Sequence, residues 1–94
     1  MGYPAKLDFD YVISKKAKQA PFLVSAIYHD DRFTYVKSAA REKPAIYEIK
    51  DGKPKLINFD FENGVYVIPK ILGSGYLAVG KKRASFQRHN AHAN

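Results

Sequence analysis

Two Asx-Gly pairs, Asp51-Gly52 and Asn63-Gly64, stand between short apolar runs and constrain the fold more than any other feature of the sequence. Pairs of this kind favour two-residue turns in which both central residues take positive φ, and such turns join antiparallel strands. The run between them, residues 55–61, alternates apolar and polar side chains. The sequence therefore predicts consecutive β-hairpins in this region rather than helices.

Alternation with a period of two continues along most of the chain. Apolar side chains at every second position are typical of half-buried strands. Together with the turn signals, they predict an all-β antiparallel sandwich of about eight short strands. A helical turn is expected at most near residues 38–43 or 70–74. The strands are expected at residues 7–13, 22–28, around Phe33 and Tyr35, at 45–49, 55–61, 65–68 and 76–79, and around Ala84 and Phe86.

The chain has 94 residues, enough for one domain. We assign residues 7–88 to the sandwich, 1–6 to a disordered or expression-derived start, and 89–94 to a disordered tail. The strand at 65–68 is apolar on both faces, which indicates a central place in its sheet. Ile57, Phe59 and Phe61 are expected to share one face. The core is expected to include Phe22, Val24, Ile57, Phe59, Val65, Val67, Leu77 and Phe86.

The net charge of +7 is unevenly distributed. Residues 1–62 carry eleven basic and nine acidic side chains, a net of +2, whereas the part after Glu62 carries five basic side chains and no acid. Such an excess indicates a nucleic acid, an acidic partner or an anionic membrane surface. Ordinary solubilising charge on exposed strand faces explains it equally simply.

Catalytic and metal chemistry have little support in the sequence. Ser74 stands in a Gly-Ser-Gly loop without a dedicated base. His29 lies beside a predicted turn and is expected to be solvated, while His89 and His92 have a metal-like spacing but no third ligand nearby. Asp8 and Asp10 fall on the polar face of a strand, where solvated carboxylates are the rule. We therefore expect no enzyme, no cofactor and no metal site.

Two kinds of binding remain open. Seven tyrosines and six phenylalanines on a basic β-domain suit an OB-like protein that stacks single-stranded nucleic acid, although alternation assigns most of these rings to the core. Peptide docking is the other kind. The first strand is followed by a lysine-rich linker and is a candidate edge strand, whose unpaired backbone could pair with another chain. The lysines could equally protect that edge.

Taken in order, the strand motifs resemble the C-terminal domain of TrbG/CagX/TraO-type outer-membrane core proteins of type IV secretion systems, and most of all the TraO proteins of conjugation plasmids. The resemblance covers about residues 9–86. It is carried by Phe9-x-Tyr11, Pro21, Tyr28-His29-Asp30-Asp31, Phe33-Thr34-Tyr35, Pro44-Ala45-Ile46-Tyr47, Asp51-Gly52, Ile57-Asn58, Gly64-Val65-Tyr66-Val67-Ile68 and Leu77-Ala78-Val79-Gly80.

Three departures from the family pattern stand out. Asp31 takes the place of a turn glycine, and because Asp tolerates the left-handed region the turn is expected to survive. Ala78 takes the place of an arginine, which removes a candidate interface charge. Some relatives have a cysteine that bonds their lipoprotein partner, whereas this chain has none.

The resemblance implies a noncatalytic structural component of the outer-membrane core complex, on the periplasmic side of the bacterial outer membrane and part of a longer secreted protein. It implies a short TraN-like lipoprotein bound noncovalently, a TraF-like channel-forming subunit, and copies of itself in a ring, without direct recognition of nucleic acid. The alternative is a basic OB-like β-domain that binds single-stranded nucleic acid.

Tyrosine gives a large contact area with a polar tip, so aromatic and apolar residues near the first strand are candidates to line lipoprotein pockets. Each could equally complete the core. The candidates are Phe9, Tyr11, Ile13, Tyr28 and Tyr35.

Overall fold

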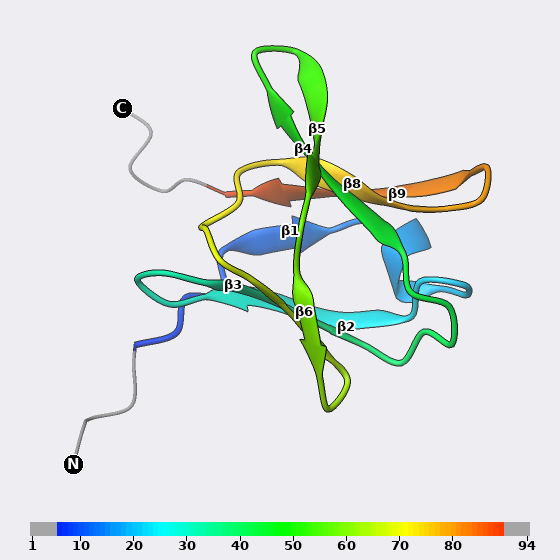
Figure 1. Cartoon of the computed structure of the whole chain (residues 1–94), viewed down its shortest axis with the longest axis horizontal. Helices are drawn as coiled ribbons and strands as arrows, with labels where there is room; N and C mark the ends of the chain where they lie inside the picture. The colour runs from blue at the N-terminus through cyan, green and yellow to red at the C-terminus, as the bar shows by residue number, and fades with distance from the viewer. Residues whose placement is uncertain (1–5, 90–94) are drawn as a thin grey trace.

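Short strands make up most of residues 6–89, the part of the chain that this computed structural model describes (Figure 1). The expected start at 1–6 and tail at 89–94, with His92, lie almost wholly outside the described residues. The elements are β1 (Tyr11–Ile13), the 3-10 turn η1 (Lys16–Lys18), β2 (Val24–His29), β3 (Thr34–Ser38), β4 (Ala45–Lys50), β5 (Lys53–Ile57), β6 (Asp60–Glu62), β7 (Val65–Ile68), β8 (Gly75–Val79) and β9 (Lys82–Arg88).

Two antiparallel sheets pack face to face as a sandwich, which confirms the predicted fold class. One sheet has the order β1-β9-β8-β4-β5, and the other has the order β2-β3-β7-β6. The described residues form nine strands. The prediction of a single strand at 55–61 is wrong, because two strands, β5 and β6, occupy this region. The chain instead leaves the edge of one sheet after Ile57 and enters the edge of the other at Asp60, as the green to yellow-green chain in Figure 1 shows.

The predicted hairpin turns are present. Asp51 and Gly52 have φ of 52° and 76°, and Asn63 and Gly64 have φ of 50° and 80°, so both central residues of each turn occupy the left-handed region. The Asp30 turn works differently. Its carboxylate accepts hydrogen bonds from the amides of Arg32 at 2.8 Å and Phe33 at 2.6 Å, as expected for an Asx turn. The turn survives with Asp31 in place of glycine, as expected, and it does so without the left-handed conformation, because the φ of Asp31 is not positive.

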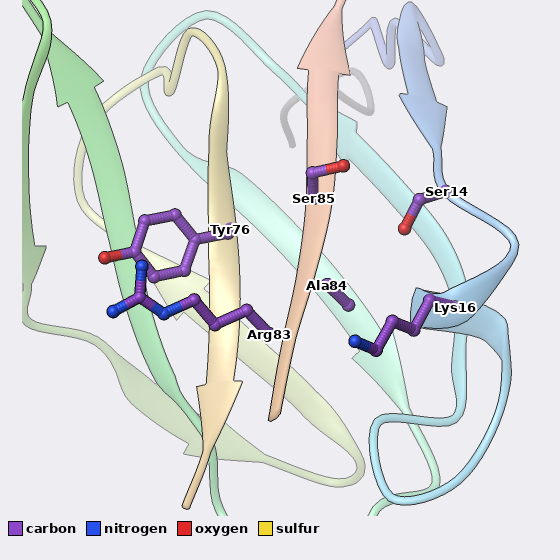
Figure 2. Close-up of a pocket in the computed structure, with 6 residues that line it drawn as sticks. All are labelled: Ser14, Lys16, Tyr76, Arg83, Ala84 and Ser85. Carbon is purple, nitrogen blue, oxygen red and sulfur yellow. The ribbon is translucent and has the colours of Figure 1, made fainter. Parts of the chain in front are cut away.

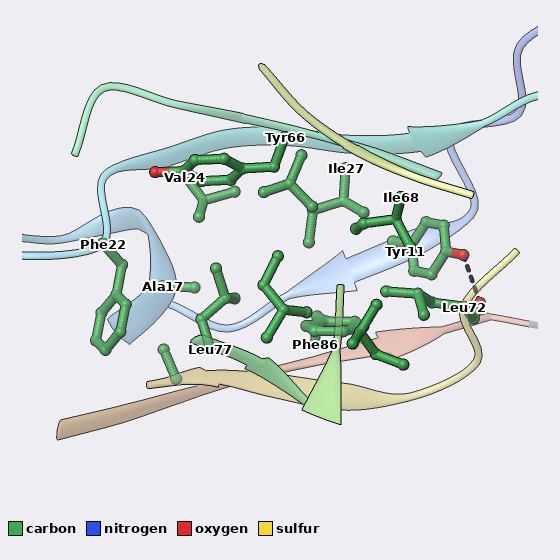
Figure 3. Close-up of a cluster of buried hydrophobic side chains, with 14 residues drawn as sticks. Tyr11, Ala17, Phe22, Val24, Ile27, Tyr66, Ile68, Leu72, Leu77 and Phe86 are labelled. Carbon is green, nitrogen blue, oxygen red and sulfur yellow. Dashed lines mark hydrogen bonds between the residues drawn. The ribbon is translucent and has the colours of Figure 1, made fainter. Parts of the chain in front are cut away.

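The core lies between the sheets, and Figure 3 shows its side chains meeting from both. Phe22, Val24, Ile57, Leu77 and Phe86 are buried there, as predicted. The other buried apolar residues are Tyr11, Ala17, Ile27, Val36, Ile46, Tyr66, Ile68, Leu72 and Ala84.

Three core assignments are wrong. Val65 and Val67 are only half-buried, since Tyr66 and Ile68 take the inward face of β7. This strand is apolar on both faces and lies between β3 and β6. Its central position was therefore predictable, but which of its two apolar faces points into the core was not. Phe59 is also half-buried and packs against the edge of the core. Because the chain changes sheets beside it, Phe61 does not share the face of Ile57 and is 54% exposed.

The helical turn is also misplaced in the sequence prediction. Residues 38–43 and 70–74 contain no helix. The turn forms at Lys16–Lys18 instead, because Ala17 is fully buried there. A three-residue turn gains nearly all its stability from such packing rather than from helix propensity.

Side chains from three strands fix residues 70–73, where the chain crosses from β7 to β8. The Thr34 hydroxyl donates to the Lys70 carbonyl at 2.8 Å and accepts from the Leu72 amide at 2.9 Å. The Tyr11 hydroxyl donates to the Leu72 carbonyl (Figure 3). The buried Glu48 carboxylate accepts from the Lys70 ammonium at 2.5 Å and from the Gly73 amide at 2.8 Å. Burial acts to raise the Glu48 pKa, but these bonds outweigh it and hold the pKa below its ordinary value.

Candidate partner-binding site

Residues 8–13 close one side of the sandwich. β1 pairs with β9, so it is an edge strand of the five-stranded sheet, although it is shorter than the strand expected at 7–13. Just before it, Asp8 pairs with His29 of β2, the edge strand of the other sheet, through amide-to-carbonyl bonds of 2.8 and 3.0 Å. This one segment therefore contacts the edges of both sheets.

A polar cluster holds this segment in place. His29 Nε2 lies 3.0 Å from Asp10 Oδ1, and Arg88 Nε donates to Asp10 Oδ2 at 3.1 Å. His29 Nδ1 lies 2.7 Å from the Asp30 carbonyl. Burial acts to raise the Asp10 pKa, but the hydrogen bond from Arg88 and the neighbouring His29 ring outweigh it, so the pKa lies below its ordinary value. The expectation of a solvated His29 is wrong, since its exposed fraction is 4%.

The five candidate residues divide between two environments. Tyr11 is 8% exposed with its ring inside the core (Figure 3), and Ile13 packs against the same core. Both sit on the inward face of β1. Phe9 is 63% exposed, and Tyr28 and Tyr35 are half-buried on the outer face of the four-stranded sheet. The structure therefore brings three of the five candidates together on an open surface.

These three residues and Phe33 form a continuous line of rings, called here the aromatic row. The ring centroids of Phe9 and Tyr28 are 4.9 Å apart, those of Tyr28 and Tyr35 are 5.2 Å apart, and those of Tyr35 and Phe33 are 6.3 Å apart. The Tyr28–Tyr35 contact follows from register, since these residues are direct partners across β2 and β3. Sequence alternation alone could not show which residues would pair.

A hydrogen bond from Tyr35 fixes the third ring of the row. Its hydroxyl donates to Asp30 Oδ2 at 2.6 Å. This bond, with the amides of Phe33 and Arg32, lowers the Asp30 pKa to about 2, and the same bond raises the Tyr35 pKa to about 12. The row therefore presents rings whose positions are set before any partner binds.

The outer face of the five-stranded sheet carries a second aromatic pair. The Tyr47 and Tyr76 rings stack at 4.9 Å, and the Arg83 guanidinium lies 4.9 Å from the centroid of the Tyr76 ring. A hollow of about 330 Å³ lies beside the Tyr76 ring. Two of the residues that line it, Lys16 and Arg83, lie on the two sides of β9 (Figure 2). The sequence analysis missed this pair, because only the register of β4 on β8 makes the two tyrosines partners.

The departures from the family pattern have local consequences. Ala78, expected to replace an arginine, is half-buried on β8 opposite Arg83 of β9. Arg83 therefore places a cation on this face, on the strand next to Ala78.

Comparison with known proteins gives one result that identifies a family. No helix among residues 6–89 is long and apolar enough to cross a membrane. No curated protein sequence matches the chain. The family model described as CagX, conjugal transfer protein, matches residues 2–89, which is nearly the whole chain. With the sandwich fold that the resemblance led us to expect, this match shows that the chain belongs to the CagX family of conjugal transfer proteins.

Proposed function

We propose that this chain is a noncatalytic structural part of the outer-membrane core complex of a type IV secretion system, on the periplasmic side of the bacterial outer membrane. The family match supports a place in a conjugation machine. The sandwich supports a binding role, because two sheets offer flat faces and edges to other subunits. The partners are a short TraN-like lipoprotein, a TraF-like channel-forming subunit and copies of the chain itself in a ring.

The lipoprotein docks along the aromatic row. The observation that carries this proposal is Phe9, which is 63% exposed although its ring lies against the Tyr28 ring, at a centroid distance of 4.9 Å. Leaving such a ring in water is unfavourable, and exposed aromatic rings with fixed geometry are typical anchors of protein interfaces. An extended lipoprotein segment would set its apolar side chains against these rings. The complex is noncovalent, since the chain has no cysteine.

The channel-forming subunit docks on the opposite face, over the Tyr47–Tyr76 pair. Arg83 and Lys16 border the hollow on this face. Two cations beside stacked rings suit a partner surface that combines apolar groups with carboxylates.

Direct binding of single-stranded nucleic acid is less well supported. An OB-like binder needs ring faces that are free to stack on bases. Here Tyr28 stacks on Tyr35, and Tyr47 stacks on Tyr76, so these rings already occupy one another's faces. The fold is a two-sheet sandwich rather than a partly open barrel of the OB type.

Isothermal titration with the cognate lipoprotein peptide tests the main proposal. The double variant Phe9→Ala with Tyr28→Ala should weaken peptide binding by roughly tenfold or more, as expected when interface anchors are truncated. Tyr47→Ala is the matched control, because it removes an equivalent stacked ring from the other face. A heteronuclear NMR spectrum of each variant establishes that it is folded.

Unchanged affinity in the folded double variant would move the lipoprotein interface away from the aromatic row. Salt dependence separates the alternative function. Docking through rings should change little between 50 and 200 mM salt, whereas phosphate binding should weaken by orders of magnitude.

A further inference from the structure

A second side of the sandwich is hollowed around residues 39–44, which join β3 to β4. Three hollows follow one another along this loop. The first, of about 390 Å³, lies between Lys43 and Leu56 to Phe59, and the second, of about 110 Å³, lies beside Phe61 and Tyr66. The third, of about 330 Å³, reaches Pro21 and Leu23. Lys43 borders the first two and Arg41 the last two, so we treat the series as one feature, called here the 39–44 groove.

The groove collects exposed apolar surface. Leu56 is 59% exposed, Phe61 is 54% exposed and Leu23 is 37% exposed. These are three of the seven large apolar side chains that are exposed among residues 6–89. Single exposed apolar residues are ordinary, but a series of them along a groove indicates an interaction surface.

The charged side chains that line the 39–44 groove are positive except for one. Arg41 and Lys43 are both exposed, and neither takes part in an ion pair among the described residues. The Lys43 ammonium instead lies 5.1 Å from the centroid of the Phe59 ring. Glu42 is the one acid that lines any of the three hollows.

The nearby acids of β6 point to the other face. Asp60 and Glu62 are partners of Val67 and Val65, which belong to the outer face of the four-stranded sheet. Because side chains alternate along a strand, Phe61 points the opposite way, toward Tyr66 at a ring distance of 5.3 Å. The groove is therefore apolar with a net positive border.

We propose that the 39–44 groove docks an extended segment of a partner protein in which apolar and acidic side chains alternate. Apolar side chains on one face of the segment would occupy the hollows at Leu56 and Phe61. The carboxylates, on its opposite face, would be met by the long side chains of Lys43 and Arg41, which border the hollows and extend around the segment. Side chains on one face of an extended segment recur every ~7 Å, which suits a series of neighbouring hollows. The first two hollows lie near the β5 and β6 edges, and the third lies beside the residues that lead into β2. No residue of the aromatic row lines any of them, so this site is separate from the row.

The probe is a synthetic nine-residue peptide of alternating leucine and aspartate with a fluorescein label, titrated into the full chain by fluorescence anisotropy. The double variant Arg41→Glu with Lys43→Glu should weaken binding at least tenfold. The matched control is Lys81→Glu with Lys82→Glu, which makes the same charge change in the exposed β8–β9 turn and should weaken binding less than twofold. The variant Phe61→Ser should also weaken binding without altering the charge.

Amide shifts in an NMR titration of the same peptide locate the site. Shifts concentrated at residues 39–44 and 56–61 support the proposal. Shifts concentrated at Tyr28 and Tyr35 would overturn it, while leaving the lipoprotein proposal in place. Equal weakening by the two charge-reversal variants, or no binding by the native chain at millimolar peptide, would also overturn it.

Discussion

The two sides of the sandwich, β1–β2 and β5–β6, differ in how their sheet edges are covered. Sheet edges expose unpaired backbone groups, and proteins normally cover or protect them. On the β1–β2 side, residues 8–13 join the two edges, because β1 pairs with β9 and Asp8 pairs with His29 of β2, and the ion pair of Asp10 with Arg88 anchors them. On the β5–β6 side, the chain only crosses from one sheet to the other. The first side is part of the core structure, whereas the second leaves large apolar side chains exposed.

Local sequence disfavours edge-to-edge pairing on the β5–β6 side. β5 contains Pro54 between Lys53 and Lys55, and β6 has only three residues. Proline cannot donate to a sheet ladder, and lysines and short length discourage edge-to-edge pairing. A side protected in this way can still bind side chains in its hollows. The β1–β2 side therefore stabilises the fold, whereas the β5–β6 side is protected only against backbone pairing.

The largest expected loss of stability comes from a substitution on the β1–β2 side. Tyr11→Ala removes a ring that is 8% exposed and its hydrogen bond to the Leu72 carbonyl. The loss should be about 3–5 kcal/mol of unfolding free energy, because truncating a buried aromatic leaves a cavity. Urea denaturation measures it. Tyr11→Phe keeps the ring and should lose only about 1–2 kcal/mol. If Tyr11→Ala unfolds at the native urea midpoint, the ring does not belong to the core.

The next effect tests the crossing at residues 70–73, to which Tyr11 also bonds. Glu48→Ala removes the acceptor for the Gly73 amide and the Lys70 ammonium. We expect a loss of about 2–3 kcal/mol, in the range of hydrogen bonds to buried charged groups. Thermal unfolding followed by circular dichroism measures it. Lys70→Ala should cost less, because the Lys70 side chain is 38% exposed and the Gly73 bond remains.

Measuring stability against pH tests the aromatic row, which lies next to the β1–β2 side. The Asp30 pKa is about 2 in the fold against 3.8 ordinarily, so its contribution to stability is complete above pH ~4 and is lost as the pH falls toward 2. The Tyr35 pKa is about 12 against 10.0, so its contribution is complete below pH ~10 and is lost as the pH rises toward 12. Tyr35→Phe should flatten both limbs of the melting temperature against pH. Limbs as steep as in the native chain would show that other groups cause them.

The smallest expected change in stability comes from a substitution on the β5–β6 side. Phe61→Ser replaces a ring that is 54% exposed, so the unfolding free energy should change by no more than about 0.5–1 kcal/mol. Urea denaturation beside Tyr11→Ala gives a direct contrast between two aromatic truncations in one domain. A loss as large as that of Tyr11→Ala would mean that the β5–β6 side is also part of the core structure.

The candidate site was only partly predictable from sequence. Aromatic residues near the first strand were expected to line a partner site, and Phe9, Tyr28 and Tyr35 do lie together. Tyr11 and Ile13 have the same alternation but lie inward, because the chain turns from β2 toward β9 between Asp8 and Tyr11. Period-two patterns give relative faces within a strand, and they lose meaning where the strand is broken.

Sequence by itself determined the elements whose signals are local. Asp51-Gly52 and Asn63-Gly64 set their hairpins because positive φ at both central residues is a property of those residues. Alternation around them determined the all-β class and five of the buried core residues, Phe22, Val24, Ile57, Leu77 and Phe86. Burial of His29, the inward turn of Tyr66 instead of Val65, and the meeting of Tyr47 with Tyr76 were decided only in the tertiary structure. Each depends on which strand lies opposite, and that choice is made by packing between residues far apart in the chain.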